Sequence, residues 1–307
     1  MIRGLALLTA ALLLAACGQE TKFTSPTAAG PVTLPAFDPN ATPRPDEPVY
    51  LGPFVAVQPS PARYVTERGV DANKRRWLNI RDTQTAISVR LGDDAADASL
   101  EALTDRYVLW RYDNALHAYD LQAASDRFVH TGKWYMLDAH IDGDWVTYLD
   151  NSDYWSNHSL TLRVLNLATG ETLLLSDSVP LAGNIMPRLA HALNGGVAAW
   201  SQKSENPRQG IIGIDNLVTR QMRKLIVPAV QGPYRFSASA NYVVWEDVGR
   251  HGYDLATNAL FTIQGVPPGW EQAYDQYIVV DNDRLEWRRY HADPSAPFFV
   301  TALLRNR

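Results

Sequence analysis

The sequence predicts an all-β protein built from a repeated unit, and three observations support this. From Tyr64 onward, short segments rich in Val, Ile, Tyr and Trp alternate with turn residues, and no stretch of 12 or more shows the apolar period of a helix. One phrase, an Asp-, Asn- or Gly-led strand that ends in an aromatic or bulky apolar residue, recurs along the chain. Its spacing matches the length of one four-stranded propeller blade. Together these observations predict a β-propeller of antiparallel blades.

The copies of the phrase set the expected number of blades. They occupy 105–110, 143–148, 195–200, 240–245 and 275–280, with a fainter copy at 62–66. Successive copies end 38, 52, 45 and 35 residues apart, a mean of 42.5. The 244 residues from Tyr64 to Arg307 hold about 5.7 such units. We therefore expect six blades, a closed arrangement that leaves only short strand edges exposed. A two-sheet β-sandwich is the structural alternative.

A second strand follows each copy and ends at an Asp or Asn. The expected turn residues are Asp82, Asp120, Asn166, Asp215 and Asp254. Asp and Asn side chains accept hydrogen bonds from the backbone two residues further on and tolerate the left-handed conformation. These positions are therefore predicted to be hairpin turns that lead into a further strand.

Two stretches carry a family resemblance. Residues 242–257 read Tyr-Val-Val-Trp-Glu-Asp and end in Tyr-Asp-Leu-Ala-Thr, and residues 165–170 read Leu-Asn-Leu-Ala-Thr-Gly. Both resemble the blade repeat of six-bladed TolB-like propellers. The usual Ser-Pro-Asp-Gly lead-in of that family is replaced here, for example by Asp-Gly-Asp at 142–144. The resemblance implies the fold, and it implies either a protein-docking platform or, as in some members, a peptidase or lactonase site.

The first residues read as a targeting segment. Residues 1–16 contain one early positive charge, Arg3, followed by an apolar run and small residues, which is the layout of a secretory signal peptide. Leu14-Ala15-Ala16-Cys17 resembles the lipobox of bacterial lipoproteins, which implies that Cys17 is lipidated. Cys17 is also the only cysteine in the chain. We expect an extracytoplasmic protein anchored by lipid to a bacterial membrane, on the periplasmic side or at the cell surface.

The expected domain organisation follows from composition. Residues 17–48 are rich in Pro, Thr and Ala and show no apolar periodicity, which predicts a linker behind the lipidated cysteine. Residues 49–307 are expected to form the propeller. The formal net charge of -5 offers no cationic surface for a phosphate backbone, so nucleic acid is not an expected partner. Motifs for nucleophilic catalysis, for zinc peptidases and for nucleotide binding are absent from the sequence, and no cofactor or metal is predicted.

Longer connections predict a binding face. In the units that contain Tyr148 and Trp200, the segment between the strand end and the turn residue is longer than in the others. Function on a propeller usually resides in such loops. The candidate binding residues there are Asp153, Tyr154, Trp155, His158 and Arg208. Aromatic rings beside polar groups suit a partner protein or a glycan. The alternative reading is that these rings only cover the backbone of their own loop.

A second group falls in the innermost strands. His140 and His191 occupy equivalent places in adjacent units, and Asp138 and Glu101 lie near them in the same class of strand. These residues are candidates for lining the central channel, where they would either hydrate it or form an acid–base or metal site. The sequence therefore favours a lipid-anchored binding platform of the cell envelope. The alternative function is a propeller hydrolase or lactonase at the channel mouth.

Overall fold

The computed structural model describes most of the chain from residue 47 onward. The described residues are 47–50, 55–57, 63–70, 76–92, 98–112, 114–132, 138–152, 159–180, 190–206, 208–228, 234–247, 249–264, 276–281, 284–289 and 299–303. All regular secondary structure in these segments is β-strand, which confirms the predicted all-β class. The described segments contain no helix of the length and apolar character that crossing a membrane requires.

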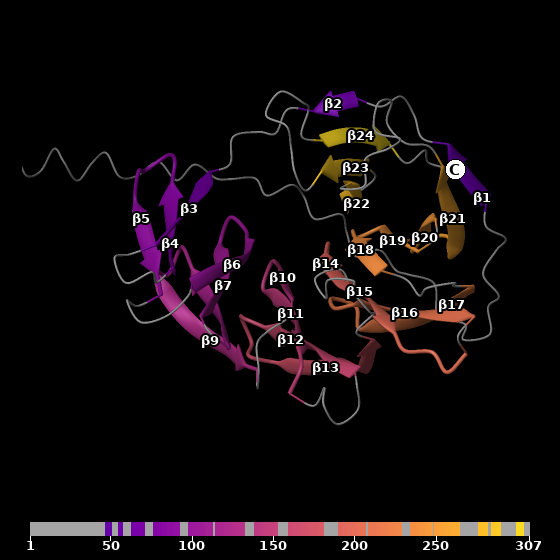
Figure 1. Cartoon of the computed structure of the whole chain (residues 1–307), viewed down its shortest axis with the longest axis horizontal. Helices are drawn as coiled ribbons and strands as arrows, with labels where there is room; N and C mark the ends of the chain where they lie inside the picture. The colour runs from indigo at the N-terminus through magenta and orange to yellow at the C-terminus, as the bar shows by residue number, and fades with distance from the viewer. Residues whose placement is uncertain are drawn as a thin grey trace, which may run out of the picture. The chain divides into compact units, whose positions relative to one another are not determined.

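The described strands form six sheets, each named below by its first strand (Figure 1). The β3 sheet contains β3 (Tyr64–Val70), β4 (Arg76–Asp82) and β5 (Ser88–Leu91). The β6 sheet contains β6 (Ala98–Leu103), β7 (Tyr107–Tyr112), β8 (Ala115–Asp120) and β9 (Ser125–Thr131). The β10 sheet contains β10 (Ala139–Asp142), β11 (Trp145–Asp150), β12 (Ser159–Asn166) and β13 (Thr172–Pro180).

The remaining sheets follow the same plan. The β14 sheet contains β14 (His191–Asn194), β15 (Val197–Gln202), β16 (Gln209–Asn216) and β17 (Gln221–Pro228). The β18 sheet contains β18 (Tyr234–Ala238), β19 (Tyr242–Glu246), β20 (Arg250–Asp254) and β21 (Ala259–Gln264), joined by β1 (Glu47–Tyr50). The β22 sheet contains β22 (Gln276–Asp281), β23 (Arg284–Arg289) and β24 (Phe299–Leu303), joined by β2 (Val55–Val57).

Consecutive strands pair antiparallel within each sheet, and the first strands connect one sheet to the next. Strand β10 lies against both β6 and β14, and β18 lies against both β14 and β22. The early strand β2 pairs with β24 and so completes the sheet formed by the last strands of the chain, while β1 pairs in parallel with β21. Successive antiparallel four-stranded sheets, joined through their first strands and completed by an early strand, are the architecture of a β-propeller.

The structure corrects three details of the expected repeat. The segment at 275–280 forms β22, the first strand of its sheet, and the counterpart of the strands ending in Trp110 and Trp245 is β23, which contains Trp287. The β3 sheet has three strands among the described residues, and β1 makes the β18 sheet five-stranded. Strand β1 also begins at Glu47, two residues before the expected start of the domain. The first and the second strand of a sheet are both buried and have the same apolar composition, so composition alone did not show that 275–280 is a first strand.

The core lies between neighbouring sheets. One apolar cluster joins Leu162 and Val164 of the β10 sheet to Leu193 and Trp200 of the β14 sheet. A second cluster joins the β6 and β10 sheets, and a third joins the β3 and β6 sheets. Because a sheet with a neighbour on each side is covered on both faces, β15 is buried along nearly its whole length and does not alternate between buried and exposed residues. This double burial explains the continuous apolar strands of the sequence.

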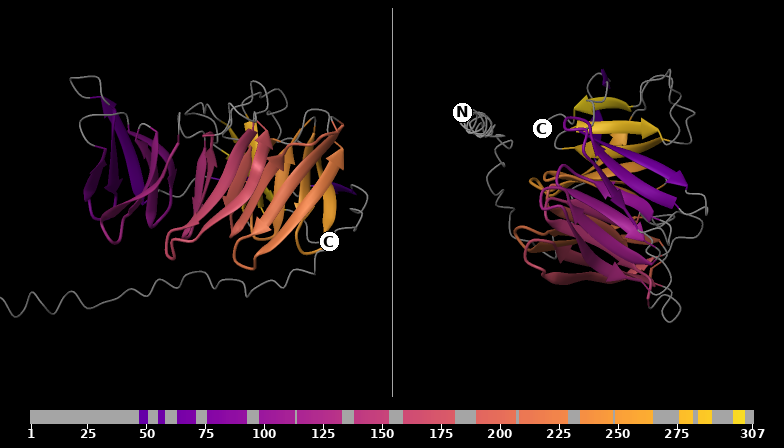
Figure 2. Two further views of the ribbon diagram at one scale, coloured as in Figure 1. Left: turned by 90° about the horizontal axis from the view of Figure 1, so that it is seen from below. Right: turned by 90° about the vertical axis from the view of Figure 1, so that its left-hand side faces the viewer.

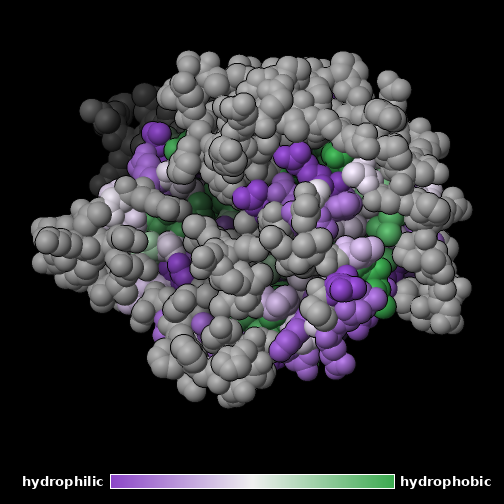
Figure 3. Space-filling view, turned by 45° about the vertical axis from the view of Figure 1, so that its right-hand side comes forward, coloured by the Kyte–Doolittle hydropathy of each residue, from purple (hydrophilic) through white to green (hydrophobic). Residues whose placement is uncertain are grey.

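The outer strands meet solvent on one side. Strand β17 alternates between buried and exposed positions, and its Met222 and Ile226 are exposed. Hydrophilic side chains cover much of the described surface in Figure 3, with hydrophobic ones visible between them. The outer strands therefore form the solvent-facing side of their sheets.

Hairpin turns gather at one edge of the sheets (Figure 2, left, lower side). At this edge the side chain of an Asp or Asn accepts hydrogen bonds from the backbone N–H groups two and three residues further on. The five residues that do so are Asp82, Asp120, Asn166, Asn216 and Asp254. The predicted turns are thus confirmed, with one correction: Asn216 forms the turn in the β14 sheet, one residue after the expected Asp215. The adjacent Asp215 is buried instead.

Candidate functional site

The two edges of the sheets differ in how the chain crosses them. We call the edge with the Asx turns, which also carries the connections at 104–106, 143–144 and 195–196, the turn edge. The opposite edge, where first strands begin and second strands end, is the loop edge. Its described residues include 138–140, 150–152, 190–191 and 202–206. In the β6, β10, β14 and β18 sheets, the connection between the second and the third strand crosses the loop edge, and in the β3 sheet the equivalent connection is the one between β3 and β4.

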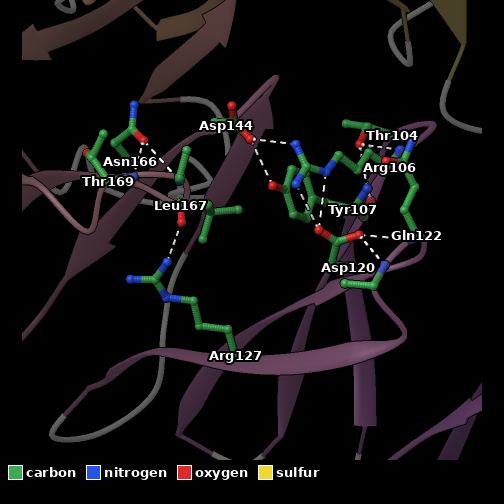
Figure 4. A network of polar contacts seen from close by, with 12 residues as sticks. Thr104, Arg106, Tyr107, Asp120, Gln122, Arg127, Asp144, Asn166, Leu167 and Thr169 are labelled. Atoms are coloured by element: carbon green, nitrogen blue, oxygen red, sulfur yellow. Dashed lines mark hydrogen bonds and ion pairs between the residues drawn. The ribbon is translucent and has the colours of Figure 1, made fainter.

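Polar side chains of the turn edge tie neighbouring sheets together (Figure 4). Arg106 of the β6 sheet donates to Asp120 in its own sheet at 3.0 Å and to Asp144 of the β10 sheet at 3.1 Å. The Tyr107 hydroxyl donates to the same Asp144 oxygen at 2.8 Å, and burial together with this carboxylate raises the pKa of Tyr107 to about 12. Arg127 donates to the carbonyl oxygen of Leu167 in the next sheet. The polar groups of this edge are therefore engaged in holding the sheets together.

The same kind of tie occurs at the next two sheet boundaries. Asp142 of the β10 sheet accepts a hydrogen bond from the backbone of Gly196 in the β14 sheet at 2.7 Å. Arg223 of the β14 sheet is buried and donates to the carbonyl oxygen of Leu255 in the β18 sheet at 3.1 Å. This repetition indicates a structural role for the turn edge.

At the loop edge, the structure brings together three of the predicted channel residues. Asp138 immediately precedes β10, His140 lies in β10, and His191 begins β14. One Asp138 oxygen, Oδ2, lies 3.2 Å from His140 Nε2 and 3.3 Å from His191 Nδ1. The two imidazole rings meet edge to face with centroids 4.4 Å apart. Adjacent first strands thus place an acid and two imidazoles within contact distance.

Burial and charge act differently on the two histidines. His191 is fully enclosed, and burial, together with the nearby His140, lowers its pKa to about 3. Burial alone would also lower the pKa of His140, but the charges of Asp138 and Glu101 outweigh it and the net shift is upward. One third of the His140 side chain is exposed. The cluster therefore has one enclosed neutral imidazole and one that solvent reaches.

Glu101, the fourth predicted channel residue, lies close enough to act on His140 by its charge. Its Oε1 is 3.4 Å from Arg111 Nε and accepts a hydrogen bond from Ser99 at 3.2 Å. Glu101 is therefore held by its own sheet, and it adds negative potential beside the cluster. It does not belong to the group of three whose donor atoms converge.

A second acidic centre lies at the loop edge, and its pairing of Asp150 with His130 was not predicted. Asp150, at the end of β11, lies 3.2 Å from His130 Nε2 of the neighbouring β6 sheet and accepts hydrogen bonds from the backbone and hydroxyl of Ser152. Burial would raise the pKa of Asp150, yet His130 and Ser152 hold it well below its usual range. Because the carboxylate stands between the histidine and the serine, this is not the order of a nucleophilic triad, in which the histidine contacts the serine. No sequence signal would have indicated the pairing, since His130 lies in an outer strand.

Most of the predicted binding residues lie outside the described residues. This applies to Asp153, Tyr154, Trp155 and His158, and also to the lipidation candidate Cys17. Arg208 is described: it is exposed, it lies in the connection between β15 and β16, and its backbone N–H donates to Asn206 at 3.0 Å. Of the binding candidates, Arg208 therefore lies at the same edge as the channel candidates, because β15 ends and β10 begins there.

A cavity of about 300 Å³ opens between the β3 and β6 sheets at the turn edge. Arg63 and Asp82 line it together with Tyr64 and Asp105. Arg63 donates to Asp82 at 3.2 Å, so the two charged groups neutralise each other. The cavity therefore offers a ligand fewer unpaired polar groups than the cluster at the loop edge.

No family model matches the sequence, and no curated protein matches it. Among solved structures, the chain is similar to Hsv2 of Kluyveromyces lactis, with a TM-score of 0.45 and 11% identity over 83% of this chain and 86% of that one. It is also similar to BamB from Moraxella catarrhalis, with a TM-score of 0.42 and 13% identity over 75% and 67%. A chain of a nidogen/laminin complex gives a TM-score of 0.39 and 10% identity over 65% and 76%. All three similarities are distant.

Proposed function

We propose that this protein is a lipid-anchored β-propeller of the bacterial cell envelope that binds a partner protein or glycan through its loop edge. The lipid would be attached at Cys17, and the linker would hold the domain away from the membrane. The proposal includes that the domain is a TolB-like propeller with six blades. It rests on the asymmetry between the two edges, because the longer connections lie at the loop edge and function on a propeller usually resides in such loops.

The observation that carries the proposal is the length of two adjacent connections at the loop edge. Eight residues join β11 to β12, six join β15 to β16 and nine join β23 to β24, whereas two join β7 to β8 and three join β19 to β20. Of the three longer connections, the first two belong to adjacent sheets. Strands β10 and β14, which begin these two sheets, are neighbours. The two extended connections therefore belong to adjacent sheets, and their sequences include Tyr154, Trp155 and Arg208. Aromatic residues and arginine are the side chains most often found at the energetic centre of an interface.

Site-specific photo-crosslinking in the source cell tests this proposal. A photoreactive amino acid at Arg208 of the full chain should yield a discrete adduct with an envelope protein. The matched control carries the same amino acid at Val218, which is 69% exposed but lies in a turn at the opposite edge, and it should yield none. Replacing Tyr154 and Trp155 by Ala should abolish the Arg208 adduct. An adduct from Val218 alone would contradict the choice of edge.

If the partner is a glycan, the same variants are tested by their binding to polysaccharide. The Tyr154→Ala/Trp155→Ala protein should lose retention on immobilised envelope polysaccharide, and the Val218 variant should keep it. The anchor is tested separately: Cys17→Ser should move the protein from the membrane to the soluble fraction. Retention of the Cys17→Ser protein in the membrane would contradict lipidation.

A hydrolase or lactonase at the channel mouth is the second candidate, and one observation favours it. Asp138, His140 and His191 converge beside the loop edge, and His140, the imidazole that solvent reaches, can move protons near neutral pH beside the Asp138 carboxylate. Hydrolysis of ester or lactone substrates by the full chain, lost in Asp138→Asn, would support this function. Equal rates for both proteins would exclude this cluster as the site.

A further inference from the structure

The Asp138, His140 and His191 cluster has the composition of a metal site. Each residue offers one donor atom, and the three atoms lie within 4.8 Å of one another. Two imidazole nitrogens with one carboxylate oxygen are a ligand set used by zinc and other divalent transition metals. Calcium and magnesium prefer sites in which all ligands are oxygen atoms, so the two nitrogen ligands make these two ions a poor fit.

The separations also fit a metal ion. Zinc binds nitrogen and oxygen at about 2.0–2.2 Å, so two ligand atoms of a tetrahedral site stand about 3.3–3.5 Å apart. Asp138 Oδ2 lies 3.2 Å from His140 Nε2 and 3.3 Å from His191 Nδ1. Two edges of the triangle therefore have nearly the separation found in an occupied site. The third separation, between the histidine nitrogens, is within 4.8 Å, and His140 is the more exposed of the two rings.

The hydrogen bonding of His191 supplies an independent observation. The side chain is fully enclosed, and neither ring nitrogen makes a hydrogen bond of normal geometry with the described residues, although the ring interacts with the backbone of Thr147. A buried imidazole without such a bond is less stable than one whose hydrogen bonds are satisfied. Its Nδ1 faces the same carboxylate oxygen as His140. A cation between the three groups would satisfy this nitrogen, and it would place positive charge where Asp138 and the nearby Glu101 are negative.

Strand geometry explains how the site is assembled. Asp138 and His140 lie two residues apart at the start of β10, so they project to the same side of the strand. His191 starts β14, the first strand of the adjacent sheet, which contacts β10. Two rigid strands therefore position the ligands, and a site built on strands is better defined than one built on loops.

We propose that Asp138, His140 and His191 bind one divalent transition-metal ion, with zinc as the ion that this ligand set fits best. The proposal goes beyond the binding platform proposed above and does not depend on it, and it departs from the expectation that no metal is bound. Three protein ligands leave a fourth tetrahedral position, and the exposed side of His140 is where a water or a substrate oxygen would reach it. Glu101 would act as a charged neighbour that is not a ligand.

Cobalt(II) titration of the full chain in detergent, after removal of metal with a chelator, tests the proposal. Cobalt replaces zinc in such sites and absorbs visible light when it is tetrahedral, so the titration should saturate at one equivalent, and added zinc should abolish the absorption. Variants His140→Gln and Asp138→Asn should each bind about 100-fold more weakly. The matched control is His117→Gln, because His117 is also a partly buried histidine that contacts a carboxylate, Asp126 at 2.7 Å, outside the cluster.

Each result either supports or overturns the metal site, provided that the variants are folded. A cooperative unfolding transition, measured in the presence of chelator, is the control for folding. Saturable binding that is lost in His140→Gln and Asp138→Asn but kept in His117→Gln supports the site. Absence of saturable binding by the parent overturns it, and so does equal affinity in the parent and His140→Gln, because the cluster is then a hydrogen-bonded group alone. If His140→Gln does not fold, Asp138→Asn carries the same comparison.

Discussion

Arg106 joins two sheets by donating to Asp144 of the β10 sheet while it holds Asp120 of its own sheet. The guanidinium also lies over the Tyr107 ring, 4.7 Å from its centroid. One side chain thus couples the Asx turn of one sheet to the turn that starts the next. Since a propeller sheet is stable only against its neighbours, such ties affect the stability of the whole domain.

Arg106→Gln should lower the free energy of unfolding by about 1 kcal/mol. The value is modest because the Arg106 side chain is 46% exposed and surface ion pairs are weakened by solvent. Arg63→Gln is the matched control: Arg63 holds the equivalent place, contacts Asp82 of its own sheet at 3.2 Å and lies over Tyr64. Urea unfolding should show a larger loss for Arg106→Gln. Equal losses would mean that the contact with Asp144 contributes nothing.

The Asx turns predict a pH dependence of stability. Burial would raise the pKa of Asp120, but the backbone N–H groups of Ala123 and Gln122 and the Arg106 charge lower it below the usual value. A carboxyl group with a lowered pKa in the folded state stabilises the protein above its unfolded pKa and loses this contribution as pH falls. Stability should therefore decrease as pH falls from about 5 toward 3.

Asp120→Asn isolates this charge. Asn occupies the same turn position at Asn166 and Asn216, so the variant keeps the acceptor for both backbone bonds. Unfolding measured by urea across this pH range should show a shallower acid loss in Asp120→Asn than in the parent. An identical slope in both proteins would show that Asp120 contributes nothing to the pH dependence.

Local chemistry explains why the strands and turns were predictable. Runs of apolar residues identify a strand, and an Asp or Asn after it identifies a turn, because both effects act within a few residues. Long-range pairing is different: nothing in residues 47–50 or 55–57 indicates that they join β21 and β24. The same limit explains β22, which has the apolar composition expected of β23.

The repeat also explains which side chains could be expected to meet. His140 and His191 occupy equivalent places in successive units, so their first strands bring them together. The contact of His130 with Asp150 depends on how an outer strand of one sheet lies against the next sheet, and the sequence contains no measure of that. Equivalent positions in a repeat are therefore predictable neighbours, and contacts between non-equivalent strands are not.

Asn166→Ala should destabilise the domain by about 1 kcal/mol. The Asn166 side chain accepts hydrogen bonds from the backbone N–H groups of Ala168 and Thr169, each at 3.0 Å, and alanine leaves these groups to the solvent. Asn166→Asp keeps the acceptor and should stay close to the parent in thermal unfolding. If alanine and aspartate behave alike, the turn does not depend on the side-chain acceptor.

Gly213→Ala should be more damaging, because Gly213 pairs with Trp200 across β15 and β16. A Cβ atom at residue 213 would lie 2.1 Å from the Trp200 ring, and the ring is 1% exposed, so it has no room to move aside. Overpacking of this kind costs about 1–3 kcal/mol. The measurement is the urea midpoint, with Trp200→Phe added in the Gly213→Ala background as the test of cause. Since Phe is smaller than Trp, the second change should recover part of the loss. If Trp200→Phe costs as much in the Gly213→Ala background as it does in the parent, the damage arises from the backbone at residue 213 and not from crowding against the ring.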